Sequence, residues 1–219
     1  MENPPEPNDP YAGERVRMVG EQIERRGITD PRVLRAMQEV PRHVFVPEPF
    51  RRNAYDDGPL PIGEGQTISQ PYIVALMTEL ARPGRRDRAL EVGTGSGYQA
   101  AVLSLLVKEV YTVEILEPLG KEAARKLRSL GYEYVTARVG DGYGGWPEKA
   151  PFNVILVTAA PEEVPPPLLE QLAPGGRLVV PVGPAGAVQI LRLYEKDPSG
   201  ALRTRDVLPV KFVPLVHPP

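Results

Sequence analysis

The chain has 219 residues, of which 42% are hydrophobic and 25% are charged, and its formal net charge at pH 7 is -2. This composition is that of a globular protein with its own core, and it excludes a chain that is disordered throughout. The lack of cysteine excludes disulfides, thiolate metal sites and a cysteine nucleophile, and the absence of a basic excess disfavours a nucleic-acid binder.

Residues 1–10 contain four prolines and little apolar content, which predicts a loose tail. They lack the basic and apolar segments of a signal peptide, and no apolar run of the chain approaches the length of a membrane span. We therefore expect a cytoplasmic protein with no membrane partner. No combination of residues points to a metal site.

Two helices are predicted at the start of the folded part. Val16, Val19 and Ile23 recur at helical spacing, and Gly27 is typical of the residue that follows a helix. A second helix is predicted to begin at Asp30-Pro31, because aspartate caps helices and proline suits the first turn.

The residues up to 85 are expected to form a helical and loop cap within a single domain of residues 11–219. Residues 41–65 are rich in proline and glycine and predict an ordered loop. Helical periodicity returns at residues 73–80, in a helix that should end before Pro83.

Residues 86–219 change to alternating strands and helices. Strands are predicted at residues 88–92, 109–114, 134–139, 152–158 and 177–182, and helices at residues 97–107, 118–130 and 164–172. The remainder predicts a hairpin with strands at residues 188–195 and 207–216. Strands that alternate with helices form parallel sheets. The expected fold is therefore α/β, with a doubly wound, mostly parallel, seven-stranded Rossmann-like sheet and an antiparallel C-terminal hairpin.

A glycine-rich turn follows the first strand of this sheet. Gly93, Thr94, Gly95 and Gly97 form a G-x-G-x-G pattern, which lets a ligand approach the backbone closely. The dinucleotide fingerprint is G-x-G-x-x-G, and Tyr98 stands where its third glycine would be. The turn therefore indicates a nucleotide-like ligand but disfavours a pyrophosphate.

Three acids accompany the glycine turn. Glu114 ends the second strand and can bind both hydroxyls of a ribose. Asp141, followed by Gly142, can accept from an adenine amino group, and Glu91 can face a cationic ligand. Taken singly, such a turn or acid is more often structural. Their order along three consecutive strand–helix units favours an adenosine that carries a sulfonium and an ammonium, which is S-adenosylmethionine.

From about residue 16 to residue 216 the sequence resembles the protein-L-isoaspartate O-methyltransferases. The resemblance is carried by specific motifs, which lie at residues 25–28, 40–47, 65–71, 90–98, 140–142, 157–161 and 212–215. It implies a class I methyltransferase fold and S-adenosylmethionine as cofactor. The implied reaction is methyl transfer to the free α-carboxylate of L-isoaspartyl residues in damaged proteins and peptides, which initiates their repair to L-aspartate.

The resemblance also implies roles for individual residues. Gln66, Thr67, Ile68 and Ser69 border the cofactor, and Ser69 is the active-site residue. Gln189 matches a further position that can reach the cofactor. From local sequence alone, Ser69 is as well explained as the N-cap of the helix that begins near Pro71. Both roles remain open at this point.

Three other readings are weighed against this one. A methyltransferase for base or amide nitrogens would carry an aromatic motif after the fourth strand, where residues 158–161 are small. A nicotinamide dehydrogenase would need the third glycine in register, and a binding module that kept the fold would not need Ser69. We expect a monomer that takes damaged proteins, and no nucleic acid, as partners.

Overall fold

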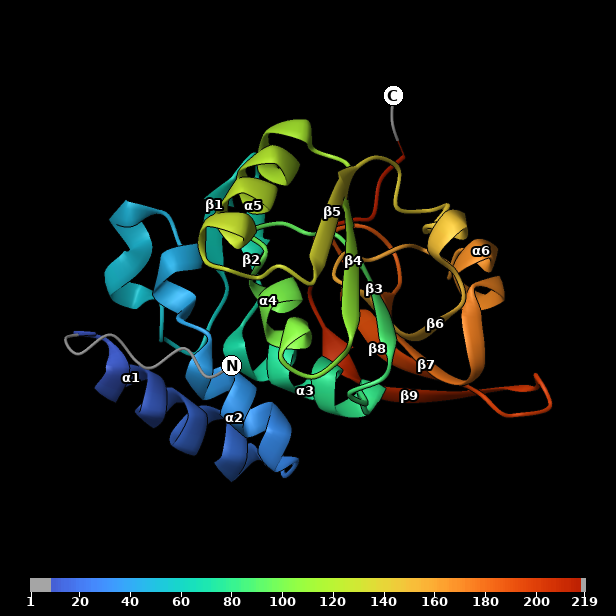
Figure 1. Ribbon diagram of the computed structural model, residues 1–219, viewed down its shortest axis with the longest axis horizontal. Helices are drawn as coiled ribbons and strands as arrows, with labels where there is room; N and C mark the ends of the chain where they lie inside the picture. The colour runs from blue at the N-terminus through green and yellow to red at the C-terminus, as the bar shows by residue number, and fades with distance from the viewer. Residues whose placement is uncertain (1–8, 218–219) are drawn as a thin grey trace.

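The computed structural model of this protein describes residues 9–217 (Figure 1). Most of the predicted tail of residues 1–10 lies outside the described residues. Asp9 is described, and its Oδ2 atom lies 2.7 Å from Nη1 of Arg15 in an ion pair.

The N-terminal part of the chain is built from short helices, a two-stranded ribbon and one longer helix. Its elements are α1 (Ala12–Arg17), the π-helix η1 (Met18–Ile23), the 3-10 helix η2 (Glu24–Arg26), α2 (Pro31–Glu39), the 3-10 helices η3 (Arg42–Phe45) and η4 (Glu48–Asn53), β1 (Leu60–Gly63), β2 (Gln66–Ile68) and α3 (Pro71–Ala81). The predicted caps are confirmed: the Asp30 side chain accepts a hydrogen bond from the Arg32 amide, and Gly27 ends η2 in the left-handed region.

Two details of this part differ from the prediction. Val16 is 59% exposed, because Arg15 takes its place on the buried face of this helical segment, whereas Val19 and Ile23 are buried as predicted. Residues 41–65 are not only loop: β1 pairs antiparallel with β2. The tight connection that allows this pairing places Gly63, Glu64 and Gly65 in the left-handed region, where glycine is favoured.

The remainder of the chain forms the predicted seven-stranded sheet. Its strands are β3 (Arg88–Val92), β4 (Glu109–Glu114), β5 (Val135–Val139), β6 (Phe152–Val157), β7 (Leu172–Val182), β8 (Gln189–Lys196) and β9 (Leu202–Val210), in the spatial order β5-β4-β3-β6-β7-β8-β9. The connecting helices are α4 (Tyr98–Ser104), α5 (Glu117–Ser129) and α6 (Pro166–Glu170), and a short 3-10 helix is η5 (Pro147–Lys149). Strand β8 is antiparallel to both of its neighbours, as the predicted hairpin requires.

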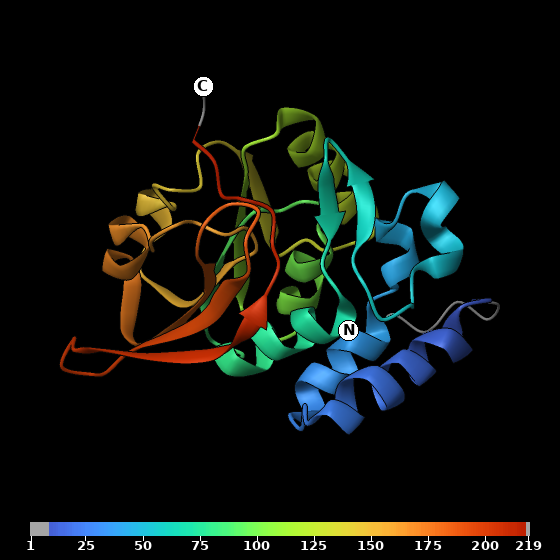
Figure 2. The same cartoon turned by 180° about the vertical axis from the view of Figure 1, so that it is seen from behind.

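The last strand was predicted in the wrong place. It begins at Leu202 and ends at Val210, whereas the sequence pattern indicated residues 207–216. Residues 202–206 are exposed, so they show no buried-strand signal. Residues 211–217 leave the sheet and continue across the molecule towards the C terminus, as Figure 2 shows.

The two faces of the sheet contribute to separate apolar cores. On one face Ala89, Val110 and Val154 pack with the N-terminal helices, α3 and α4. On the other face Leu90 and Ile155 pack with residues of α6 and neighbouring loops. This alternation follows from the period of two in a strand. Figure 1 shows α1 and α2 beside one end of the sheet, with the long β9 strand extending towards the other.

The chain reverses its direction of winding at the centre of the sheet. From β3 it proceeds to β4 and β5 on one side, and it then returns to β6 on the other side of β3. Val92 pairs in register with both Val113 and Val157, so these strands end at the same edge. Ligands of open α/β sheets bind at this reversal, outside the carboxyl ends of the strands.

One buried cation connects the N-terminal part to this edge. The Arg42 side chain is fully buried, and its Nε donates to the Ala54 carbonyl oxygen at 2.7 Å. Its guanidinium carbon lies 5.1 Å from the ring centroid of Tyr98, the first residue of α4. Burial lowers the pKa of Arg42 to about 10. Arg42 thus holds the loop before β1 against the helix that follows the glycine turn.

We predict that Arg42→Ala lowers the free energy of unfolding by roughly 2 to 4 kcal/mol, because the Ala54 carbonyl loses its donor and a cavity remains. Urea unfolding followed by circular dichroism measures this. Lys121→Ala, which removes an exposed ion pair to Glu117, serves as control and should unfold at the wild-type urea concentration. Equal midpoints for all three proteins would show that Arg42 does not hold this contact.

Candidate functional site

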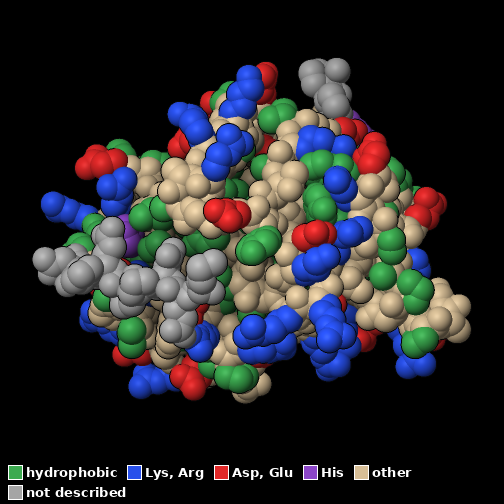
Figure 3. All heavy atoms as spheres, in the orientation of Figure 1, with side chains coloured by type: hydrophobic (Ala, Val, Ile, Leu, Met, Phe, Trp, Pro, Cys, Tyr) green, Lys and Arg blue, Asp and Glu red, His purple; other side chains and the backbone are tan. Residues whose placement is uncertain are grey.

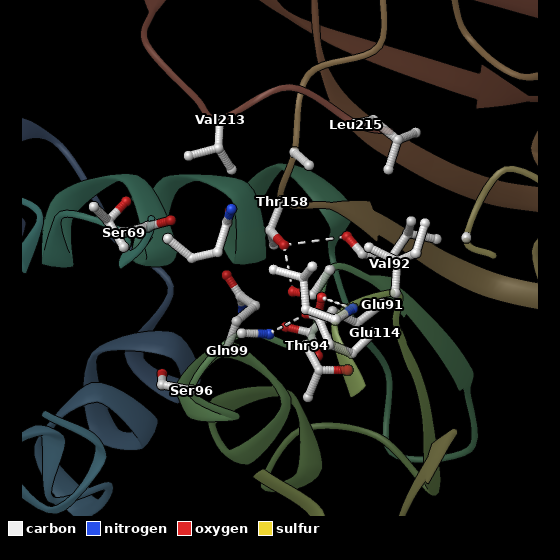
Figure 4. Close-up of a pocket in the computed structure, with 18 of the residues that line it drawn as sticks. Ser69, Glu91, Val92, Thr94, Ser96, Gln99, Glu114, Thr158, Val213 and Leu215 are labelled. Carbon is white, nitrogen blue, oxygen red and sulfur yellow. Dashed lines mark hydrogen bonds between the residues drawn. The ribbon is translucent and has the colours of Figure 1, made fainter. Parts of the chain in front are cut away.

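A pocket lies at the carboxyl edge where the winding reverses. We call it the inner pocket; side chains on its walls are shown in Figure 4. It is lined by residues from the turn and strand before α3, from the ends of β3, β4 and β6, from α3 and α4, and from the C-terminal segment: Gln66, Thr67, Ile68, Ser69, Val74, Glu91, Val92, Gly93, Thr94, Gly95, Ser96, Tyr98, Gln99, Val113, Glu114, Ile115, Leu116, Gly142, Thr158, Ala159, Val213, Pro214, Leu215 and Val216. Of the thirteen residues predicted to form the site, ten are in this set.

Glycine is required at two positions of the wall for steric reasons. Gly93 has a φ of 97°, and a Cβ atom there would lie 2.5 Å from Oγ1 of Thr158. A Cβ atom on Gly142 would collide with Cγ1 of Val92. Any side chain at either position would displace Thr158 or Val92, so the glycines permit the close approach of the turn after β3 to Thr158 and of the loop after β5 to Val92.

Glu91 is fully buried near the end of β3, and no cationic side chain of the described residues is paired with it. Its Oε2 accepts a hydrogen bond of 2.5 Å from the hydroxyl of Thr112, the residue paired with it on β4. The Thr112 hydroxyl in turn lies 2.6 Å from that of Thr94. Oε1 of Glu91 has no hydrogen-bond partner among the described residues. Burial raises the pKa of Glu91 to about 8, helped by the charge of nearby Glu114, so the carboxyl group is protonated at neutral pH.

Glu114 fastens the glycine turn to the end of β4. Its Oε2 accepts from the Gly95 amide at 2.8 Å, and its Oε1 accepts from the Leu116 amide at 3.0 Å. Carboxylate oxygens have lone pairs beyond these two bonds, so Glu114 can also accept from a ligand hydroxyl.

Ser69 does not cap α3. The N-cap position is Gln70, and no side chain forms a cap hydrogen bond there. Ser69 instead lines the inner pocket and also a second one, which we call the outer pocket. The alternative explanation of Ser69 as a capping residue is therefore wrong.

The outer pocket opens beside Ser69, between α3 and the end of β9. Its walls come from η2, the loops around β2, α3, β9 and the C-terminal segment: Arg26, Pro59, Thr67, Ser69, Gln70, Tyr72, Ile73, Thr158, Val188, Leu208, Pro209, Val210, Lys211, Phe212 and Val213. Its volume is ≈ 460 Å³, and that of the inner pocket is ≈ 140 Å³. Arg26 and Lys211 are its charged residues, and both are basic.

Three predicted site residues lie outside the set that lines the inner pocket. Gly97 takes a left-handed conformation at the N-cap of α4. Asp141 stands beside Gly142, and its Oδ2 lies 3.3 Å from Nδ1 of His217. Gln189 is buried, and its Oε1 accepts from the Phe212 amide at 2.9 Å, so it holds the C-terminal segment and not the pocket wall itself.

The C-terminal segment of residues 211–217 closes one side of the inner pocket. It pairs with Ala160 through the Ala160 amide to the Val213 carbonyl at 2.8 Å and the Leu215 amide to the Ala160 carbonyl at 2.9 Å. The Tyr143 hydroxyl also donates to the Leu215 carbonyl at 3.3 Å. The prediction of a strand here missed this role, although the motif at residues 212–215 marked the segment.

These walls fit a cationic adenosine better than a phosphorylated one. Oε1 of Gln99 is a buried acceptor with no donor among the described residues, and Oε1 of Glu91, also without a partner there, becomes an acceptor once that carboxyl group ionises. Within residues 9–217, no lysine or arginine lines the inner pocket to neutralise a phosphate. Unpaired acceptors in a pocket favour a ligand that brings donors and positive charge.

We predict that Glu91→Gln flattens the pH dependence of stability. Between pH 4.5 and about 8 the folded wild type keeps a proton that the unfolded chain releases, so its free energy of unfolding should fall as the pH rises through this window. Glutamine is neutral throughout and removes this loss. Thermal unfolding of both proteins without ligand at pH 5, 6.5 and 8 provides the comparison. If the stability of both proteins changes with pH in the same way, Glu91 is ionised in the folded protein.

Comparison with known proteins assigns the family. The family model described as protein-L-isoaspartate(D-aspartate) O-methyltransferase matches residues 14–218. A protein-L-isoaspartate O-methyltransferase of Opitutus terrae is 61% identical over 204 residues, which is 93% of this chain and 87% of that protein. One from Syntrophobacter fumaroxidans is 56% identical over 95% of this chain and 88% of its own.

Solved structures agree with this assignment. A protein-L-isoaspartate O-methyltransferase superposes with a TM-score of 0.83 at 33% identity, over 91% of this chain and 65% of that one. A candidate enzyme of the same kind from Plasmodium falciparum, in complex with S-adenosyl-L-homocysteine, gives 0.77 at 25% identity over 92% and 98% of the two chains. The chain described here belongs to the protein-L-isoaspartate O-methyltransferase family.

Proposed function

We propose that Ser69 positions the acceptor carboxylate in the reaction of this family, the methylation of L-isoaspartyl residues with S-adenosylmethionine. The observation that carries the proposal is the wall shared by the two pockets. Thr67, Ser69, Thr158 and Val213 line both, so a ligand in the inner pocket and one in the outer pocket meet at Ser69. The cofactor would occupy the inner pocket, and the isoaspartyl segment the outer one.

The acceptor needs little chemical assistance from the protein. S-adenosylmethionine supplies an activated methyl group when it is bound. An α-carboxylate has a reference pKa near about 3.5 and is already ionised at neutral pH, so no side chain has to remove a proton. What remains is to orient the carboxylate and exclude water. The Ser69 hydroxyl is not used as a helix cap and can donate to this carboxylate.

The cofactor contacts follow from the walls of the inner pocket. We assign the ribose hydroxyls to Glu114 and the adenine to Asp141 and Gly142. The support for this is that Glu114 and Gly142 face the pocket, with Asp141 adjoining Gly142. The residues from Gln66 to Ser69 and the glycine turn complete the cofactor site in this proposal. Gln189 acts indirectly, because it anchors Phe212 beside the segment that closes the pocket.

The outer pocket suits an anionic peptide segment. The charged residues of its lining, among those that the structure describes, are Arg26 and Lys211; Arg26 is ion-paired with Asp57 at 3.1 Å, which leaves Lys211 as the cation that a substrate carboxylate can meet. The guanidinium carbon of Arg26 lies 3.6 Å from the ring centroid of Tyr72, which keeps the cation at the wall of the pocket. The positive charge of Lys211 favours the free carboxylate that distinguishes an isoaspartyl linkage from a normal peptide bond.

We also propose that the protein works in the cytoplasm as a monomer. Residues 11–85 and 86–219 form one domain in this proposal, and nucleic acid is not a partner. Packing of α3 against β6 and β7 supports the single domain. The net charge of -2 disfavours nucleic acid as a partner. Asp and Glu side chains share the face shown in Figure 3 with Lys and Arg, which also disfavours it. Among the described residues, no helix is long and apolar enough for a membrane span.

We predict that Ser69→Ala lowers turnover about tenfold to a hundredfold, the usual worth of a hydrogen bond to a charged group, and leaves cofactor affinity within about twofold. The assay uses S-adenosylmethionine labelled in its methyl group and two peptides that differ only in a normal Asp-Gly or an isoaspartyl linkage. Base-labile label is counted on each.

The matched control is Ser129→Ala, which alters an exposed serine at the end of α5. It should methylate the isoaspartyl peptide at the wild-type rate, and no protein should label the normal peptide. Full turnover by Ser69→Ala would refute the proposed role of Ser69. Label on the normal peptide would refute the proposed selectivity of the outer pocket.

A further inference from the structure

Gln99 is a buried side chain of the inner pocket that no sequence motif singled out. It lies in the first turn of α4 and is 6% exposed. Figure 4 shows it reaching from α4 into the space between Ser69 and Glu91.

A chain of hydrogen bonds fixes which end of the Gln99 amide faces the ligand. The Thr78 hydroxyl donates its single proton to the Val74 carbonyl oxygen of α3 at 2.7 Å. It can therefore only accept from Gln99, whose Nε2 donates to it at 3.0 Å. The amide nitrogen must face Thr78, and a flipped amide would set two acceptors against each other. Gln99 thus presents its oxygen on the side away from Thr78.

That oxygen lacks a donor. Oε1 of Gln99 is buried and has no hydrogen-bond partner among the described residues. Leaving a buried acceptor unpaired costs free energy, so the site is completed by a ligand group that donates. A carboxylate or phosphate at this position would be repelled, because it offers only acceptors.

The cofactor offers few groups that meet this requirement. Its donors are the adenine amino group, the ribose hydroxyls and the α-ammonium. The adenine amino group is assigned to the wall at Gly142, and the ribose hydroxyls to Glu114. Gln99 is instead tied to α3, the helix that directly follows Ser69 and the reacting centre. The α-ammonium is the donor at that end, and the unpaired Oε1 of Glu91 lines the same pocket.

We propose that Oε1 of Gln99 accepts a hydrogen bond from the α-ammonium of S-adenosylmethionine and of its product S-adenosylhomocysteine. Gln99 thereby selects ligands with a free amino group, and Thr78 is the positioning residue that orients its amide. This inference rests on the proposed placement of the cofactor in the inner pocket.

The test is a binding cycle measured by titration calorimetry on the full chain. The ligands are S-adenosylhomocysteine, its analogue with hydrogen in place of the amino group, and 5′-methylthioadenosine, which lacks the amino-acid end. Gln99→Leu should bind S-adenosylhomocysteine about tenfold to a hundredfold more weakly than the wild type. It should bind the deaminated analogue and 5′-methylthioadenosine with affinities within about threefold of the wild type. Equal losses for S-adenosylhomocysteine and the deaminated analogue would overturn the proposal.

Two further variants separate this role from a general effect on folding. Thr78→Val keeps the shape of the side chain but leaves the Gln99 amide without its acceptor. It should weaken the binding of S-adenosylhomocysteine but not of the deaminated analogue, and by less than Gln99→Leu does. Gln171→Leu changes a buried glutamine whose two ends are bonded to Trp146 and Gly144 within the protein. This variant should lose stability but keep the wild-type ratio of the affinities for S-adenosylhomocysteine and for the deaminated analogue. A changed ratio in Gln171→Leu would contradict the assignment of the preference for the amino group to Gln99.

The outcome also distinguishes the inference from its premise. A wild type that binds 5′-methylthioadenosine but shows no preference between S-adenosylhomocysteine and its deaminated analogue refutes the role of Gln99 alone. A wild type that binds none of the three ligands refutes the placement of the cofactor, and the inference with it.

Discussion

A carboxyl group buried without a cation is the constraint around which this site is arranged. Glu91 is the residue before the last one of the central strand β3 and is fully buried, and none of the described residues that line the inner pocket is arginine or lysine. Such a group must stay protonated or meet a positive charge. The Thr112 hydroxyl satisfies one of its oxygens, and the glycine turn that begins at Gly93 leaves the pocket open beside it. A cofactor that carries a sulfonium and an ammonium supplies the positive charge that the described lining of this pocket lacks.

The walls of the site come from parts of the chain that are far apart in sequence. The residues before α3 provide Ser69, the parallel strands provide Glu91 and Glu114, and residues 211–217 close the remaining side. This enclosure matters for the reaction, because the charges of a carboxylate and a sulfonium cancel as the methyl group moves. Electrostatic interactions strengthen when water is excluded, so a pocket of low polarity favours the transfer.

The sequence predicted the parallel sheet well because each of its elements carries a local signal. The buried runs of β3 and β6, the glycine turn and the cap at Asp30 depend on residues close together in the chain. The β1–β2 ribbon and the path of residues 211–217 were missed for the same physical reason. Strands β1 and β2 bury one residue each, Ile62 and Ile68, and none of residues 211–217 is buried. Too few buried positions exist there for a period of two or 3.6 to show. Gln99 was missed because its significance depends on Thr78, a contact across two helices.

We infer that Glu91 is neutral in the free protein and becomes charged when a cationic cofactor fills the inner pocket. This claim is tested most directly by calorimetric titration of S-adenosylmethionine at pH 6.5 in buffers of different ionisation enthalpy. At this pH the amino group of the cofactor is already protonated, so any released proton comes from the protein. With a Glu91 pKa of about 8, the wild type should release about one proton on binding, and Glu91→Gln should release almost none. A binding enthalpy that does not depend on the buffer in the wild type would contradict the claim.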